Sequence, residues 1–155
     1  FFINLAYFTV VEFLLFYLQD SIGLGKDRAG EFQGLILLAV TVSALIGTIA
    51  AGNALRRVTK KQIVYASCVL LILPALVFAF TKDQNAVLAL AAIFGLGWGA
   101  FQAVDWALAV NLLPKGGAAK YMAIWHVCMT VPQIIAPLFG KVADILNANY
   151  TTQYG

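Results

Sequence analysis

Long apolar stretches alternate with short polar segments along nearly the whole chain. The five apolar stretches span residues 1–18, 34–54, 63–80, 87–112 and 121–140. A helix rises about 1.5 Å per residue, so roughly 20 apolar residues cross the hydrocarbon core of a bilayer. Because lipid offers no hydrogen bonds to the peptide groups, segments that cross it in this way must be helical. The pattern predicts an all-α, polytopic membrane helix bundle with five spanning helices.

Composition and charge support a membrane protein and exclude most soluble classes. Of the 155 residues, 62% are hydrophobic and only 11% are charged. The net charge of +3 does not indicate a nucleic-acid partner, because the basic residues lie in loops between apolar stretches. The chain begins inside an apolar stretch without an initiator methionine and ends in a polar one. We therefore expect it to be a fragment of a larger membrane protein.

The basic residues divide unequally between the two ends of the predicted helices. Six of the ten Lys and Arg residues lie in the loops at 55–62 and 113–120: Arg56, Arg57, Lys60, Lys61, Lys115 and Lys120. Cytoplasmic loops carry an excess of Lys and Arg, so these two loops are predicted to be cytoplasmic. The expected location is the plasma (inner) membrane, with lipid as the surrounding partner.

Two of the predicted helices carry small residues at a spacing of four. The ridges are Ala39, Ser43, Gly47 and Ala51 in one helix, and Ala91, Gly95, Gly99, Ala103 and Ala107 in the other. Small residues on one helix face let two backbones approach closely inside lipid. The ridges predict close helix contacts, which either pack statically or slide during function.

Polar side chains inside the spans are the candidates for function. A charged group at the bilayer centre costs roughly 3 kcal/mol on insertion scales, so such groups face a polar partner or a watery cavity. The intramembrane candidates are Asn4, Glu12, Gln102, Asp105, His126 and Gln133. Trp98, Gln102 and Asp105 fall on one helix face, roughly a third of a turn from the small ridge. A helix with one packing face and one polar face suits a solute pathway.

Each titratable candidate has two interpretations. Glu12 lies too deep for its carboxylate to reach the headgroups, so it is either a proton-binding acid or a structural acid bonded to a neighbouring helix. Asp105 either couples ion binding or caps local structure. His126 is a proton relay, a metal ligand or a packing residue, but no second His or Cys/His spacing supports a metal. With no catalytic or phosphate-binding motif present, we expect no enzyme activity and no cofactor.

The most specific sequence pattern lies between residues 105 and 137. It comprises Asp105-Trp106-Ala107-Leu108, Asn111-Leu112-Leu113-Pro114, Gly117, Lys120-Tyr121-Met122, Trp125 and Pro132-Gln133-Ile134-Ile135-Ala136-Pro137. This pattern resembles helices ten and eleven of major facilitator superfamily transporters, most closely the glycoside–pentoside–hexuronide symporters and sucrose carriers. The resemblance implies that the chain holds helices seven to eleven of twelve, and that an N-terminal half of the same protein completes the pathway. It also places the first and fourth helices, which carry Glu12 and Asp105, around a central cavity.

The chain departs from the family pattern at several positions. In the cytoplasmic signature G-x-x-x-D-R-x-G-R-K, Gly52, Arg57, Lys60 and Lys61 fit, but Arg56 and Thr59 replace the acid and the second glycine. Asn111 and His126 stand where the family usually has Asp and Asn, which leaves the substrate open.

The resemblance implies a secondary transporter that moves a sugar or similar polar solute by alternating access, coupled to a proton or another cation. Trp98 would then stack on the solute, Gln102 and Gln133 would hydrogen-bond it, and Asn4 and His126 would complete the site. Glu12 or Asp105 would couple ion binding to solute binding. The alternatives are a drug or metabolite exporter of the same fold, and a non-transporting membrane sensor or assembly subunit.

Overall fold

The computed structural model describes residues 1–112, 118–140 and 142. The described residues form five α-helices and no strand: α1 (Phe2–Asp20), α2 (Lys26–Ala54), α3 (Lys60–Phe78), α4 (Gln84–Leu112) and α5 (Ala118–Ile135). All five are long and apolar enough to cross a membrane. The prediction of an all-α bundle with five spanning helices is confirmed. Lys115 lies outside the described residues.

Four of the five helices begin before their apolar stretch, α4 (Gln84) and α5 (Ala118) by three residues each. α2 begins at Lys26 rather than near residue 34, and α3 begins at Lys60 rather than near residue 63. Helix hydrogen bonds do not require an apolar environment, so a helix can continue into the solvated region beyond the span. In α2, Asp27 in the first turn also stabilises the positive end of the helix dipole. Of the predicted basic loop, only Arg56 and Arg57 lie outside a helix, whereas Lys60 and Lys61 belong to the first turn of α3.

A capping box fixes the start of α3. The Thr59 hydroxyl accepts a hydrogen bond from the Gln62 backbone N–H at 3.4 Å, and the Thr59 N–H donates to Gln62 Oε1 at 3.0 Å. This reciprocal pair satisfies two backbone donors that a helix N-terminus otherwise leaves without partners. Thr59 thus has a local structural role at the position where the family signature has glycine.

Thr59→Ala is expected to lower the free energy of unfolding by about 1 kcal/mol, because the side-chain cap is lost. The measurement is denaturant unfolding of the purified protein in mixed micelles. Thr41→Ala is the matched control, since the Thr41 hydroxyl is exposed and bonds only the Leu37 carbonyl of its own helix, at 2.8 Å. An equal loss in both variants would contradict a capping role for Thr59.

Pro137 ends α5 before the end of the last apolar stretch. α5 stops at Ile135, and a turn at Ala136 and Pro137 leads into a short helical segment over 138–140. Proline lacks an amide hydrogen and disfavours helical geometry in the residue before it. Pro132, in contrast, lies inside α5. The fifth stretch is therefore one helix with an interruption near its end, rather than a continuous helix to residue 140.

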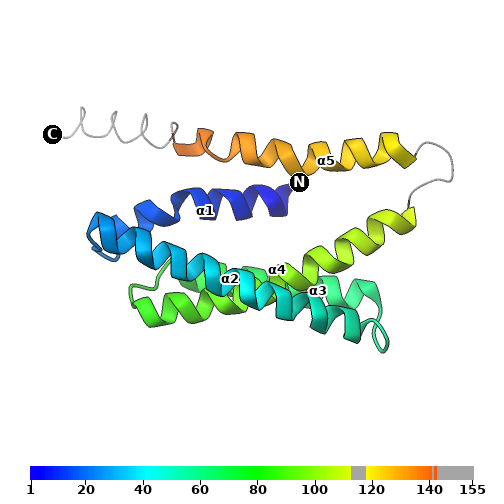
Figure 1. Cartoon of the computed structure of the whole chain (residues 1–155), viewed down its shortest axis with the longest axis horizontal. Coiled ribbons are helices and arrows are strands. Elements are labelled where there is room, and N and C mark those ends of the chain that lie inside the picture. Colours follow the sequence, from blue (N-terminus) through cyan, green and yellow to red (C-terminus); the bar gives the residue numbers. More distant parts are fainter. Residues whose placement is uncertain (113–117, 141, 143–155) are drawn as a thin grey trace. The chain divides into compact units, whose positions relative to one another are not determined.

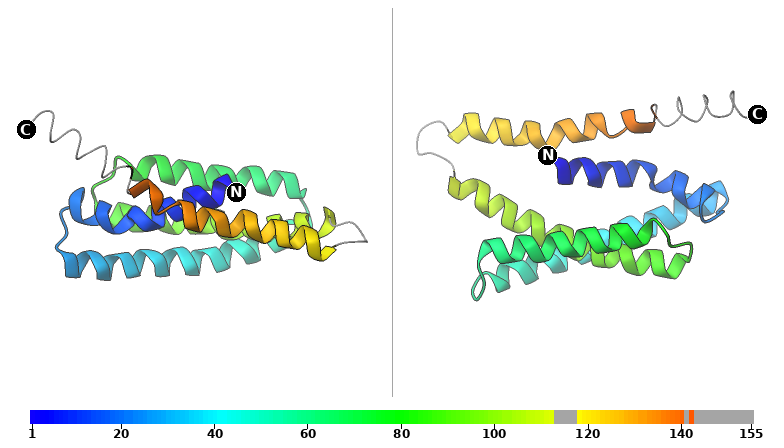
Figure 2. Two further views of the ribbon diagram at one scale, coloured as in Figure 1. Left: turned by 90° about the horizontal axis from the view of Figure 1, so that it is seen from above. Right: turned by 180° about the vertical axis from the view of Figure 1, so that it is seen from behind.

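The chain divides into two compact units. The three-helix unit, Leu18–Leu113, contains α2, α3 and α4; the α1/α5 unit comprises Phe1–Tyr17 with Pro114–Gly155. In the three-helix unit, α2 and α3 each pack on α4, with α3 running antiparallel to the other two helices (Figure 1). In the α1/α5 unit, both helices run in the same direction, as Figure 2 also shows.

The two small-residue ridges meet in the three-helix unit. A Cβ built at Gly95 would collide with the Ser43 side chain, and one at Gly99 would collide with the Ala44 carbonyl. A Cβ built at Gly47 of α2 would likewise collide with the Leu96 carbonyl of α4. Because the backbones of α2 and α4 lie so close together, Thr48 Oγ1 of α2 can donate a hydrogen bond to the Gly99 carbonyl at 3.1 Å. The ridges make the close helix contacts that the sequence predicts, and they make them with each other.

Candidate functional site

The packing of α4 determines which of its faces is left for function. Gly95 and Gly99 lie against α2, and Val104 is fully buried in a small cluster with Ala51 and Ile63. Trp98, Gln102 and Asp105 lie on another face of α4 and are all half-buried. The structure therefore places these three predicted site residues on one helix face.

An aromatic pair and an amide form the centre of this face. The Trp98 and Phe101 rings are stacked, with centroids 6.5 Å apart and an interplanar angle of 22°. Gln102 Oε1 is buried and accepts no hydrogen bond from any residue in the described part of the chain. A buried polar atom left without a partner costs about 1–3 kcal/mol. Such an atom is expected where a bound molecule or a further segment supplies the donor.

The candidates on α1 differ in exposure. Asn4 is buried, with 6% of its surface exposed, whereas Glu12 is exposed. About two turns of helix separate them. No hydrogen bond or ion pair to Glu12 occurs within the α1/α5 unit as far as it is described.

The candidates on α5 are both exposed. The His126 ring contacts the Met122 carbonyl through Nδ1 at 2.8 Å, one turn earlier in the same helix. A carbonyl oxygen only accepts, so Nδ1 carries the proton and, in the neutral ring, Nε2 is the acceptor. Gln133 lies about two turns further along α5. Among the described residues, no group of three or more His, Cys, Asp or Glu side chains could hold a metal ion.

Lys60 has a structural contact that its sequence position did not indicate. Its Nζ donates a hydrogen bond to the Ala107 carbonyl at 3.2 Å, which links the start of α3 to the last part of α4. A hydrogen bond from an ammonium group to a carbonyl is charge-assisted and stronger than a neutral one. The partners lie far apart in sequence, and no local pattern could have revealed the contact. Lys61 lies 5.8 Å from the centre of the Tyr65 ring, on the same helix.

Comparison with known proteins identifies the family. Neither the curated proteins nor the solved structures gave a match to this chain. The sequence model of the Major Facilitator Superfamily matches residues 1–137, which include all five helices and every candidate residue described above. The chain therefore belongs to the major facilitator superfamily, a family of membrane transporters.

Proposed function

We propose that the chain is part of a secondary active transporter that moves a sugar or glycoside by alternating access, coupled to a proton. The observation that carries this proposal is the face of α4 on which the buried, unpartnered Gln102 Oε1 lies near the stacked Trp98 and Phe101 rings. The protein is an integral membrane transporter by family; the solute and the coupling ion are the proposed part.

The chemistry of this face suits an uncharged polyhydroxylated solute. A sugar ring has hydroxyl groups around its edge and C–H groups on its faces. An indole offers a large apolar surface, on which such a face can stack. The amide of Gln102 has an oxygen that accepts and an NH₂ that donates, so it can bond a hydroxyl in either role. Asn4, His126 and Gln133 are further candidates for the solute hydroxyls.

The two intramembrane acids are the proposed coupling groups. A carboxylate inside a span is costly while ionised, and protonation removes most of that cost. Glu12 on α1 and Asp105 on α4 are therefore suited to change protonation when the cavity changes sides. In a half built of inverted three-helix repeats, α1 and α4 are the first helices of the two repeats, and the other half of the protein would complete the cavity. The loop with Arg56 and Arg57 would lie on the cytoplasmic side of the plasma (inner) membrane.

The test is radiolabelled sugar uptake by the full-length protein reconstituted in vesicles, with and without an imposed pH gradient. Symport predicts that a gradient acidic outside drives accumulation above the external concentration. Accumulation driven only by the opposite gradient would indicate the exporter. The absence of flux for every sugar and glycoside tried, from folded protein, would contradict the proposed solute class and favour the sensor or assembly subunit.

Gln102→Leu is expected to raise the half-saturation concentration for uptake about tenfold, because one hydrogen bond to the solute is lost. The substitution keeps the approximate size of the side chain and removes the unpartnered oxygen, so stability should not fall. Gln84→Leu, at the exposed start of the same helix, is the matched control and should leave uptake unchanged. Wild-type half-saturation in Gln102→Leu would remove this amide from the solute site.

A further inference from the structure

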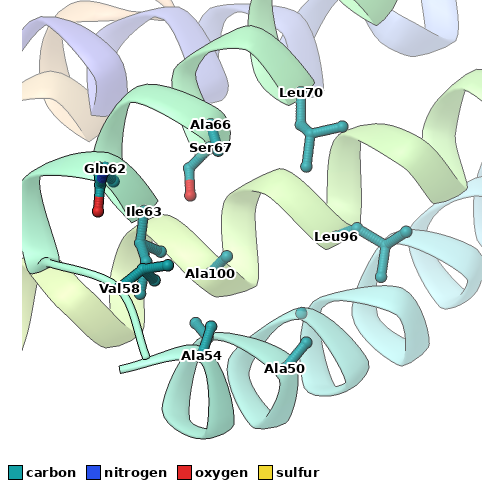
Figure 3. Close-up of a pocket in the computed structure, with 12 residues that line it drawn as sticks. Ala50, Ala54, Val58, Gln62, Ile63, Ala66, Ser67, Leu70, Leu96 and Ala100 are labelled. Atoms are coloured by element: carbon teal, nitrogen blue, oxygen red, sulfur yellow. The ribbon is translucent and has the colours of Figure 1, made fainter. Parts of the chain in front are cut away.

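An open groove runs along the three-helix unit between α2 and α3. Both helices pack on α4 rather than closely on each other, and the space between them measures about 560 Å³. Figure 3 shows Ala50 and Ala54 of α2 and Ile63 and Ser67 of α3 pointing into this space, with Ala100 of α4 beside them. The lining side chains are small and almost entirely apolar, so the groove is shaped for a slender apolar chain.

The groove is shorter than one leaflet of a bilayer. Its lining runs from Val58 and Gln62 at the α2–α3 loop to Leu70 on α3 and Gly47 on α2. At 1.5 Å per residue, this is about 10–12 Å along each helix, which is less than the roughly 15 Å of one hydrocarbon leaflet. A neighbouring transmembrane helix would need a groove through both leaflets. The dimensions therefore favour the acyl chain of a single lipid.

One polar group in the groove lacks a partner. Ser67 is only 1% exposed, its Oγ makes no hydrogen bond to any described residue, and its side chain is part of the groove lining. It lies about 10 Å from the start of α3 and about 6 Å past Ile63, where the apolar stretch begins. An ester carbonyl of a glycerolipid would be an acceptor for this hydroxyl.

The loop at this end of the groove is positively charged. Arg56 and Arg57 directly precede Val58, which lines the groove, and both arginines are exposed. Backbone hydrogen bonds from Arg57 and Val58 to the Ala54 carbonyl, both at 2.9 Å, hold the loop against the end of α2. The loop from Leu55 to Thr59 contains no acid. Clustered cations beside a membrane helix attract anionic headgroups.

We propose that this groove binds one anionic glycerophospholipid, with an acyl chain between α2 and α3, an ester carbonyl at Ser67 and the phosphate at Arg56 and Arg57. The charged loop lies at one end of the groove, the unpartnered hydroxyl lies further in, and apolar side chains line the groove on both sides of that hydroxyl. The site is separate from the α4 face that carries Trp98 and Gln102.

The test is native mass spectrometry of the delipidated full-length protein in detergent, with equal amounts of phosphatidylglycerol and phosphatidylethanolamine. We expect one phosphatidylglycerol to bind, in preference to the zwitterionic lipid. Each surface cation contributes about a fivefold gain in attraction to an anionic lipid, so Arg56→Gln with Arg57→Gln should weaken phosphatidylglycerol binding about thirtyfold. Lys26→Gln with Arg28→Gln removes the same charge at the opposite end of α2 and should leave binding unchanged.

A second pair of variants tests the apolar part of the site. Ala50→Leu fills the groove and should reduce binding of both lipids, whereas Ala75→Leu, exposed on α3 outside the groove, should not. If Ala50→Leu fails to fold, Ser67→Ala adds no bulk and should still weaken binding severalfold. Equal binding of the two lipids, unchanged binding in the arginine double variant, or a dimer mass in place of a lipid adduct would each overturn the proposal.

Discussion

Gly99→Ala is expected to lower the free energy of unfolding by about 2 kcal/mol, although the substitution adds only one methyl group. The new Cβ would collide with the Ala44 carbonyl, which belongs to the backbone of α2 and cannot move away by a change of rotamer. To relieve the clash, α2 and α4 must separate, which would also lengthen the hydrogen bond from Thr48 Oγ1 to the Gly99 carbonyl. Denaturant unfolding in mixed micelles would measure the loss.

Gly34→Ala is the matched control and is expected to change stability in the opposite direction. Gly34 lies in α2, and nothing lies within 4 Å of the position that its Cβ would take. Alanine loses less conformational freedom than glycine in a helix, so this variant should gain about 0.5–1 kcal/mol. A gain in both variants would contradict the close contact between α2 and α4.

The same pair of variants separates the two interpretations of the ridges. If the ridge only packs, the Gly99→Ala molecules that remain folded should transport at the wild-type rate. If the ridge slides during transport, the rate per folded molecule should fall as well. The transport rate is divided by the amount of folded protein in the vesicles, which is measured by size-exclusion chromatography after extraction.

The helices could be predicted from the sequence because lipid leaves the backbone few alternatives. A long apolar stretch that crosses a bilayer must be helical, and small residues four apart mark where helices approach. The helix ends were harder to predict, since hydropathy marks the membrane boundary and not the last hydrogen bond. Lys26 and Lys60 begin their helices outside the apolar stretches, and only the Thr59 and Gln62 pair gave a local signal for the second of these starts.

The candidate site could be predicted only within single helices. Helical periodicity placed Trp98, Gln102 and Asp105 on one face, and the structure has them on one face of α4. The burial of Gln102 Oε1 and of the Ser67 hydroxyl could not be predicted, because it depends on side chains far away in the sequence. The side chains that bury these two groups belong partly to other helices, and the periodicity of one helix does not identify those neighbours.

Glu12→Gln is expected to abolish accumulation of solute driven by a pH gradient, while exchange of labelled for unlabelled solute continues. The amide has nearly the shape of the protonated acid and can still donate and accept hydrogen bonds, so solute binding should survive. It cannot release a proton, so the cavity can no longer carry one through the cycle. Paired assays of accumulation and exchange in the same vesicles separate these two effects.

The control and the alternative acid make the result specific. Glu31→Gln removes an equivalent charge in the solvated first part of α2 and should leave both assays unchanged. If Asp105 is the coupling acid, Asp105→Asn will lose accumulation and Glu12→Gln will retain it. If neither variant loses accumulation, proton coupling by Glu12 or Asp105 is wrong. Glu12 is the first acid to test because it lies inside a predicted span, where an ionised carboxylate is costly, and is exposed within its own unit.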